Sequence, residues 1–109
     1  MAKSTMSPEL LALVAERFKA LGEPVRLQIL NVLRGGESSV NELAEEIGLG
    51  QANTSKHLQL LHALGFVARR KEGLHVFYSL ADESVFTLCD IVCGRIQTQL
   101  DAQMRALAS

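Results

Sequence analysis

Apolar residues recur at helical spacing in five stretches of the chain, and residues that start or stop helices bound these stretches. The first stretch follows the helix start Ser7-Pro8-Glu9 and ends before Gly22, which predicts a helix over residues 8–21. The same spacing predicts four more helices, one from residue 24 to the glycine pair at 35–36 and the others at about 40–47, 52–64 and 82–106.

Two stretches rich in β-branched and aromatic residues lie between the last two helices. They cover residues 66–70 and 75–80, and the segment between them contains Gly73, which favours a hairpin turn. A helix–turn–helix at 40–64, followed by a hairpin wing at 66–80 and a last helix, is the order of a winged helix–turn–helix. We therefore expect one domain over residues 1–109, mostly α with a small β-hairpin.

Composition places the chain among ordinary globular proteins. It has 109 residues, of which 48% are hydrophobic and 21% charged. No window reaches the roughly 18 consecutive apolar residues of a membrane helix, and the first residues lack the pattern of a signal peptide. We therefore expect a cytoplasmic protein without a membrane association.

The net charge of −1 conceals a basic block. Residues 51–80 hold four Lys and Arg against one Glu, which gives +3 and leaves −4 for the remainder. All three histidines also lie in this block. A locally positive face can bind DNA despite a neutral total charge, although a solvated charged face would show the same pattern.

The helix at 52–64 has the two sides that a base-reading helix needs. Leu58, Leu61 and Leu64 form an apolar side, and polar residues gather at the amino-terminal half, where backbone N–H groups also attract phosphate. The alternative is a polar surface helix without a ligand. We predict DNA contacts at Gln51, Asn53, Thr54, Ser55, Lys56, His57 and Gln59, although the spacing of Thr54 to Leu58 also places it on the inward side.

His57 has two possible roles, and the sequence favours neither. It could donate a hydrogen bond to a phosphate, or it could lock its helix to neighbouring helices. On the hairpin, positive side chains beside the turn could lie along the DNA backbone or minor groove, unless the tip is merely solvated. These residues are Arg69, Arg70, Lys71 and His75.

Several segments together resemble one family. FKALGEPVRLQIL at 18–30, SKHLQLL at 55–61 and VFYSL at 76–80 are similar to the ArsR/SmtB family of bacterial transcriptional repressors, over roughly residues 10–100. The resemblance implies a homodimer joined through the first and last helices, 8–21 and 82–106. It also implies a palindromic double-stranded DNA operator, and release when a metal, metalloid or other signal reaches the dimer.

The chain departs from two metal sites of this family. Its arsenic and cadmium sensors carry Cys-Val-Cys where this chain has Ser39-Val40-Asn41. Its zinc sensors carry Asp, His, His and Glu on the last helix. The matching residues here are Asp82, Ser84, Arg95 and Thr98, so at most one zinc ligand is kept.

Both cysteines, Cys89 and Cys93, lie one helical turn apart on the last helix. They share an apolar arc of about 160° at 100° per residue, wider than the roughly 100° that covering one core requires. The thiols could be small apolar residues of an interface. They could also bind As(III), Zn(II), Cd(II) or Cu(I) with a further ligand from elsewhere, or sense oxidants or sulfur species.

The sequence thus predicts a DNA-binding transcriptional repressor that a signal releases at the dimer interface. The alternatives are a winged-helix protein-interaction module, or a repressor without a ligand whose cysteines are only structural. We expect no enzymatic activity, because the sequence contains no nucleophile elbow, no phosphate-binding glycine loop and no paired carboxylates on a plausible cleft.

Overall fold

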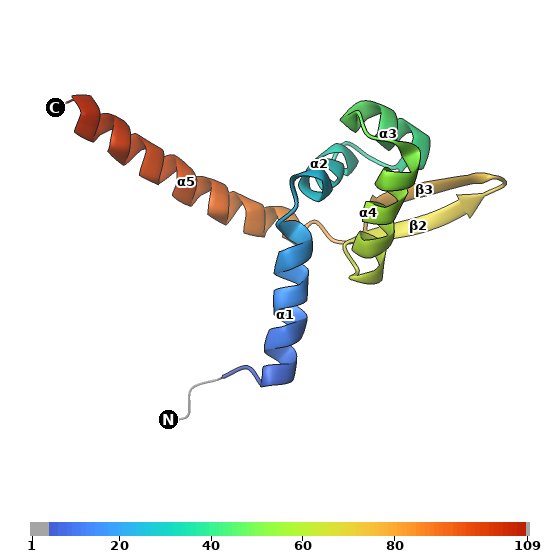
Figure 1. Cartoon of the computed structure of the whole chain (residues 1–109), viewed down its shortest axis with the longest axis horizontal. Coiled ribbons are helices and arrows are strands. Elements are labelled where there is room, and N and C mark those ends of the chain that lie inside the picture. The colour runs from blue at the N-terminus through green and yellow to red at the C-terminus, as the bar shows by residue number, and fades with distance from the viewer. Residues whose placement is uncertain (1–4, 109) are drawn as a thin grey trace.

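A computed structural model describes residues 5–108 of the chain. The predicted fold class is confirmed, because five helices and a small antiparallel sheet follow one another in the expected order (Figure 1). Residues 1–4, on which part of the signal-peptide expectation rests, lie outside the described residues. The helices are α1 (Pro8–Leu21), α2 (Pro24–Leu33), α3 (Val40–Ile47), α4 (Gln51–Ala63) and α5 (Ser84–Ala108), and the strands are β1 (Ser38–Ser39), β2 (Val67–Glu72) and β3 (His75–Leu80).

Side-chain caps set the helix starts. The Ser7 hydroxyl accepts a hydrogen bond from the Leu10 N–H at 3.1 Å, as expected. Ser39 and Glu42 form a capping box at the start of α3. The last helix begins at Ser84 rather than at Asp82, because the Asp82 carboxylate accepts the Ser84 N–H at 2.9 Å. This hydrogen bond lowers the pKa of Asp82.

The sheet is larger than the sequence predicted. β2 extends to Glu72, which pairs with His75, so the turn holds only two residues, with Gly73 at φ 60°. β1 was not expected at all. Its two residues pair with β3, which gives the strand order β1-β3-β2.

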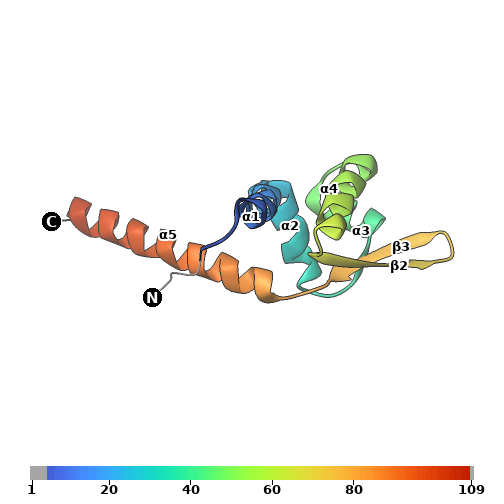
Figure 2. The same cartoon turned by 90° about the horizontal axis from the view of Figure 1, so that it is seen from below.

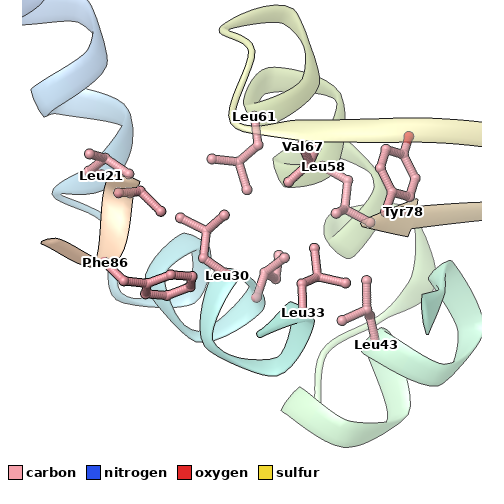
Figure 3. Close-up of a cluster of buried hydrophobic side chains, with 11 residues drawn as sticks. Leu21, Leu30, Leu33, Leu43, Leu58, Leu61, Val67, Tyr78 and Phe86 are labelled. Carbon is pink, nitrogen blue, oxygen red and sulfur yellow. The ribbon is translucent and has the colours of Figure 1, made fainter. Parts of the chain in front are cut away.

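The core lies where α2, α3, α4 and the sheet meet the first turn of α5. Figure 3 shows the side chains converging from these elements, with Leu30 and Leu33 of α2 at the centre. The predicted inward residues Leu58 and Leu61 of α4 are fully buried. At roughly 25 cal/mol per Å² of apolar surface, burial of this kind is the main stabilising term of the domain.

The molecule has a body and two arms. The body is residues 20–89, and the arms are residues 8–19 of α1 and 90–108 of α5. The α5 arm points away from the hairpin, and the α1 arm projects sideways from the body (Figures 1 and 2). The radius of gyration is 17.6 Å, against about 13 Å for a compact chain of this length. Every residue from 90 to 108 is exposed. The arms therefore gain almost no burial from their own chain.

Candidate nucleic-acid interface

Helix α4, predicted to read DNA bases, presents most of the predicted polar residues to solvent. Gln51, Asn53, Lys56 and Gln59 are exposed and Ser55 is half-buried. The N-cap is Gly50, which has no side chain to cap the helix. Backbone N–H groups of the first turn are therefore left for a ligand, and a phosphate suits them.

Thr54 does not fit its predicted DNA contact. Its side chain is 0% exposed, and its hydroxyl donates to the Gly50 carbonyl at 2.9 Å. A buried hydroxyl that already has its partner cannot reach a base or a phosphate. Its spacing to Leu58 correctly indicated an inward orientation, and Thr54 packs between α4 and the rest of the body.

The wing divides its basic residues between two faces. Arg69 pairs with Tyr78 and Lys71 with Val76. These four share the face of the hairpin that holds Val67, which is buried, and Leu80, which is partly buried. Tyr78 is itself in the core. Lys71 and Arg69 therefore lie on the side of the hairpin that faces the helices, and neither has an ion pair among residues 5–108 within 4.0 Å.

Arg70 lies on the opposite face of the wing and is held by two carboxylates. Its Nε and Nη2 donate to the Glu37 carboxylate at 2.8 and 2.7 Å, and its Nη1 donates to Glu72 at 2.5 Å. The guanidinium also lies 4.6 Å from the Phe77 ring centre. These hydrogen bonds raise the pKa of Arg70 and lower that of Glu37. The predicted phosphate contact at Arg70 is thus disfavoured, since its charge is already paired.

A hollow connects the reading helix with the wing. It has a volume of about 590 Å³, and it is lined by Asn41 of α3, Gln51 and Ser55 of α4, and His75 and Val76 of β3. His75 is exposed, with its ring 6.2 Å from that of Phe77. The start of α4 and the base of the hairpin turn therefore line one hollow, which holds both polar and apolar side chains.

His57 is half-buried and contacts the body. Its Nδ1 lies 3.1 Å from Nη1 of Arg26, a residue of α2 that the sequence analysis did not single out. Of the two roles that the sequence left open for His57, the contact that locks α4 to a neighbouring helix is present. His62, near the end of α4, is exposed as expected.

The two cysteines lie away from this interface, where α5 leaves the body. Cys89 is half-buried and Cys93 exposed. Both line an apolar pocket of about 390 Å³ with Phe18, Leu27 and Val92. Across residues 5–108 no three His, Cys, Asp or Glu residues are grouped so that they could hold a metal ion. A metal bound here would need a ligand from outside the described chain.

These features define a winged helix–turn–helix DNA-binding protein, and comparisons with known proteins agree. The family model for bacterial regulatory proteins of the arsR family matches residues 23–69. The biofilm growth-associated repressor of Xylella fastidiosa is 41% identical over 86 residues, which cover 79% of this chain and 75% of that protein. The HTH-type transcriptional regulator NmtR of Mycobacterium tuberculosis is 43% identical over 79 residues, which cover 72% of this chain but only 66% of NmtR.

A solved structure shows the same architecture. The homodimeric winged helix–turn–helix DNA-binding domain Mb0332 of Mycobacterium bovis, a possible ArsR-family transcriptional regulator, is 35% identical to this chain. It aligns with a TM-score of 0.74 over 89% of this chain and 90% of that one. The chain belongs to the ArsR family, as the resemblance in its sequence implied.

Members of this family are DNA-binding transcriptional regulators and not enzymes, so DNA binding is favoured over a protein-interaction module. The family's thiolate position at residue 39 is here a helix cap, because the Ser39 hydroxyl accepts the Glu42 N–H at 3.1 Å. Within the described part of the chain, none of the helices has the length and apolar character needed to cross a bilayer.

Proposed function

We propose that the chain is a repressor that binds a palindromic operator as a homodimer. The arms would join the two copies, and each copy would place α4 in one major-groove half-site with its wing beside it. One observation carries this proposal. Most of the exposed large apolar residues lie on the arms, and the α5 arm extends away from the end of the molecule that holds α4 and the wing (Figure 1).

The arms have the surface of an interface that lacks its partner. Phe18 is 56% exposed, Ile96 and Leu100 are 50% exposed, and Met104 is 67% exposed. A contiguous apolar patch of this kind marks a contact surface. A second copy fits because a two-fold dimer buries the same face of both chains, and because a relative of the same architecture is homodimeric.

The DNA contacts follow from charge and exposure. Phosphate contacts would come from Lys56, Arg69 and Lys71, because these side chains are exposed and positive. His75 lies beside them on the wing. Base contacts would come from the start of the reading helix, where the exposed or half-buried amides and hydroxyls gather. These residues are Gln51, Asn53, Ser55 and Gln59.

A salt titration tests the placement of the reading helix. Binding to the promoter region of the protein's own gene should weaken steeply with salt. Lys56→Ala should weaken binding to all sequences and reduce the slope of log K against log salt by about one. His62→Ala is the matched control, because His62 is exposed on the same helix beyond the proposed contacts. An unchanged slope in Lys56→Ala would contradict the proposed placement.

We further propose that the repressor is released by a thiophilic species at Cys89 and Cys93, with As(III) the first candidate inducer. Thiols four residues apart on a helix lie on one face and can share one soft ion. Their place beside both arms gives a ligand a route to the dimer interface. Release would be a population shift, which requires a few kcal/mol of preference for the conformer that no longer fits DNA.

The double variant Cys89→Ser/Cys93→Ser tests this step. It should bind the operator as the wild type does, but should not be released by arsenite. Zinc, cadmium and hydrogen peroxide are run in parallel on both proteins to separate metal binding from oxidation. If no agent distinguishes the two proteins, the cysteines are small apolar residues of the interface.

A further inference from the structure

Arg26 connects three helices through one side chain. It lies in the first turn of α2, and its Nε donates to the Ala20 carbonyl of α1 at 2.5 Å, while its Nη2 lies 3.5 Å from the Lys19 carbonyl. Its Nη1 lies 3.1 Å from Nδ1 of His57 on α4. The guanidinium holds its donors in one rigid plane. The end of α1 and the middle of α4 are therefore tied to the same rigid group.

The hydrogen bond to His57 has only one possible direction. A guanidinium has donors and no acceptor, so Nδ1 of His57 must accept and the ring proton lies on Nε2. The contact is partly buried and joins residues 31 positions apart. This contact gives His57 a structural role, whereas the neighbouring Lys56 is exposed to solvent.

The contacts to α1 also have a local cause. The last carbonyls of a helix have no partner within the helix, and a cation is favourable there. Gly22 turns the chain directly after α1, and its N–H lies 2.9 Å from the Phe18 carbonyl. Arg26 reaches the next two carbonyls. It thus fixes the end of α1 at the place where this helix enters the body.

We propose that Arg26 is a positioning residue that sets the angle of the reading helix α4 against the arm helix α1, through His57. The proposal rests on the dimer and operator proposed above. Because α1 would join the two copies, this angle would set the spacing of the two reading helices, which must match half-sites about 34 Å apart. Loss of the contact should lower affinity for the operator more than affinity for unrelated DNA.

Two substitutions at His57 separate positioning from DNA contact. Asparagine places an amide oxygen where Nδ1 lies and can still accept from Arg26, whereas glutamine places its amide near Nε2. If His57 positions α4, His57→Asn should retain operator affinity and His57→Gln should lose about tenfold, a size within the range of couplings between contacting residues. If His57 contacts phosphate through Nε2, the order of the two variants is reversed and the proposal is overturned.

Arg26 itself gives the second test. Arg26→Lys keeps the charge but cannot span three acceptors, so it should resemble His57→Gln, and combining the two should add little. The salt slope should stay at the wild-type value, because neither variant removes a phosphate contact. Full additivity, or a lowered slope, would overturn the proposal.

A measurement without DNA keeps the inference separate from operator binding. A spin label at His62→Cys, in the Cys89→Ser/Cys93→Ser background, reports the distance between the two α4 helices of a dimer. The distance distribution should be narrow for the otherwise unaltered protein and for His57→Asn, and broad for His57→Gln. If the three labelled proteins gave equal distance distributions, positioning by His57 would be overturned. If the wild-type protein did not bind DNA at all, only the proposed operator function would be overturned.

Discussion

The body and the arms have similar apolar residues but opposite surroundings. In the body, Ile29, Leu43 and Leu61 are 0% exposed, because helices and a sheet converge on them (Figure 3). In the arms, residues of the same kind such as Ile96 and Leu100 remain half exposed. Amphipathic spacing therefore predicts that one face of a helix will be buried. It does not predict whether the same chain or a second chain buries it.

Two kinds of stability therefore act in this small protein. The body contains its own core, so its folding depends on contacts within the chain. The arms would gain burial only on association, so their contribution depends on protein concentration. The effects of substitutions in the two regions should consequently be measured by different experiments.

The largest effect is expected from a charge in the arm interface. Ile96→Asp should convert the dimer to a monomer. It would place a carboxylate in an apolar interface, and each copy would lose burial of the exposed half of Ile96, about 1 kcal/mol, twice per dimer. Sedimentation at several concentrations measures it. Thr98→Asp is the control, because Thr98 is exposed on the other side of α5. A dimer that survives Ile96→Asp would contradict the proposed interface.

A cavity in the body should instead lower the free energy of unfolding of each chain, whether or not it is dimeric. Leu61→Ala removes a fully buried side chain and should lower the free energy of unfolding by about 2–5 kcal/mol. Urea denaturation measures the loss, which should be similar at low and high protein concentration. Leu100→Ala in the arm should lower the midpoint at high protein concentration, where the wild type is dimeric, and should have little effect at low concentration, where both proteins are monomers. The same dependence in both variants would erase the distinction between body and arms.

A smaller effect separates two adjacent cations of the wing. Lys71→Ala should reduce the salt slope of DNA binding by about one, because Lys71 faces the reading-helix side without an ion pair among the described residues. Arg70→Ala should leave that slope unchanged, because the charge of Arg70 is already paired with Glu37 and Glu72. Its effect should be a less ordered wing, measured by amide exchange of Phe77. A reduced slope in Arg70→Ala would restore the phosphate contact predicted from the sequence.

The smallest effect concerns acid. The hydrogen bonds from Arg70 hold the pKa of Glu37 below its ordinary value of 4.5. A carboxyl with a lowered pKa in the folded state stabilises the fold above its unfolded pKa, and this stabilisation is lost as the pH falls through the lowered folded value. Phe77 amide exchange should therefore quicken as the pH falls below 4.5, the ordinary pKa of the carboxyl, after correction for intrinsic exchange. In Glu37→Gln this additional acid dependence should be absent.

The helices and the polar character of α4 could be predicted from local sequence. Ser7 and Ser39 start helices through side chains only three residues away from their partners, and the apolar spacing of Leu58 and Leu61 selects the inward side of α4. Such features depend on neighbours in the chain. The two-residue strand β1 was missed because only its pairing with Phe77 and Tyr78 makes it a strand.

Contacts between distant residues were not predictable in this way. Arg70 and Lys71 are adjacent in sequence with equal charge, and the partner Glu37, 33 residues away, distinguishes them. The two readings of His57 were equal because Arg26 lies 31 residues from it. Thr54 could be read as polar or as inward until its burial was known.

The order of the elements, the family and the place of the basic block follow from the amino-acid sequence alone, because propensities, caps and periodicity act over a few residues. Which polar side chains stay without a partner, and so could contact DNA, depends on the folded chain. A charged group or a hydroxyl is available to a ligand only if no other residue of the folded chain already pairs with it, and such a residue can be distant in the sequence.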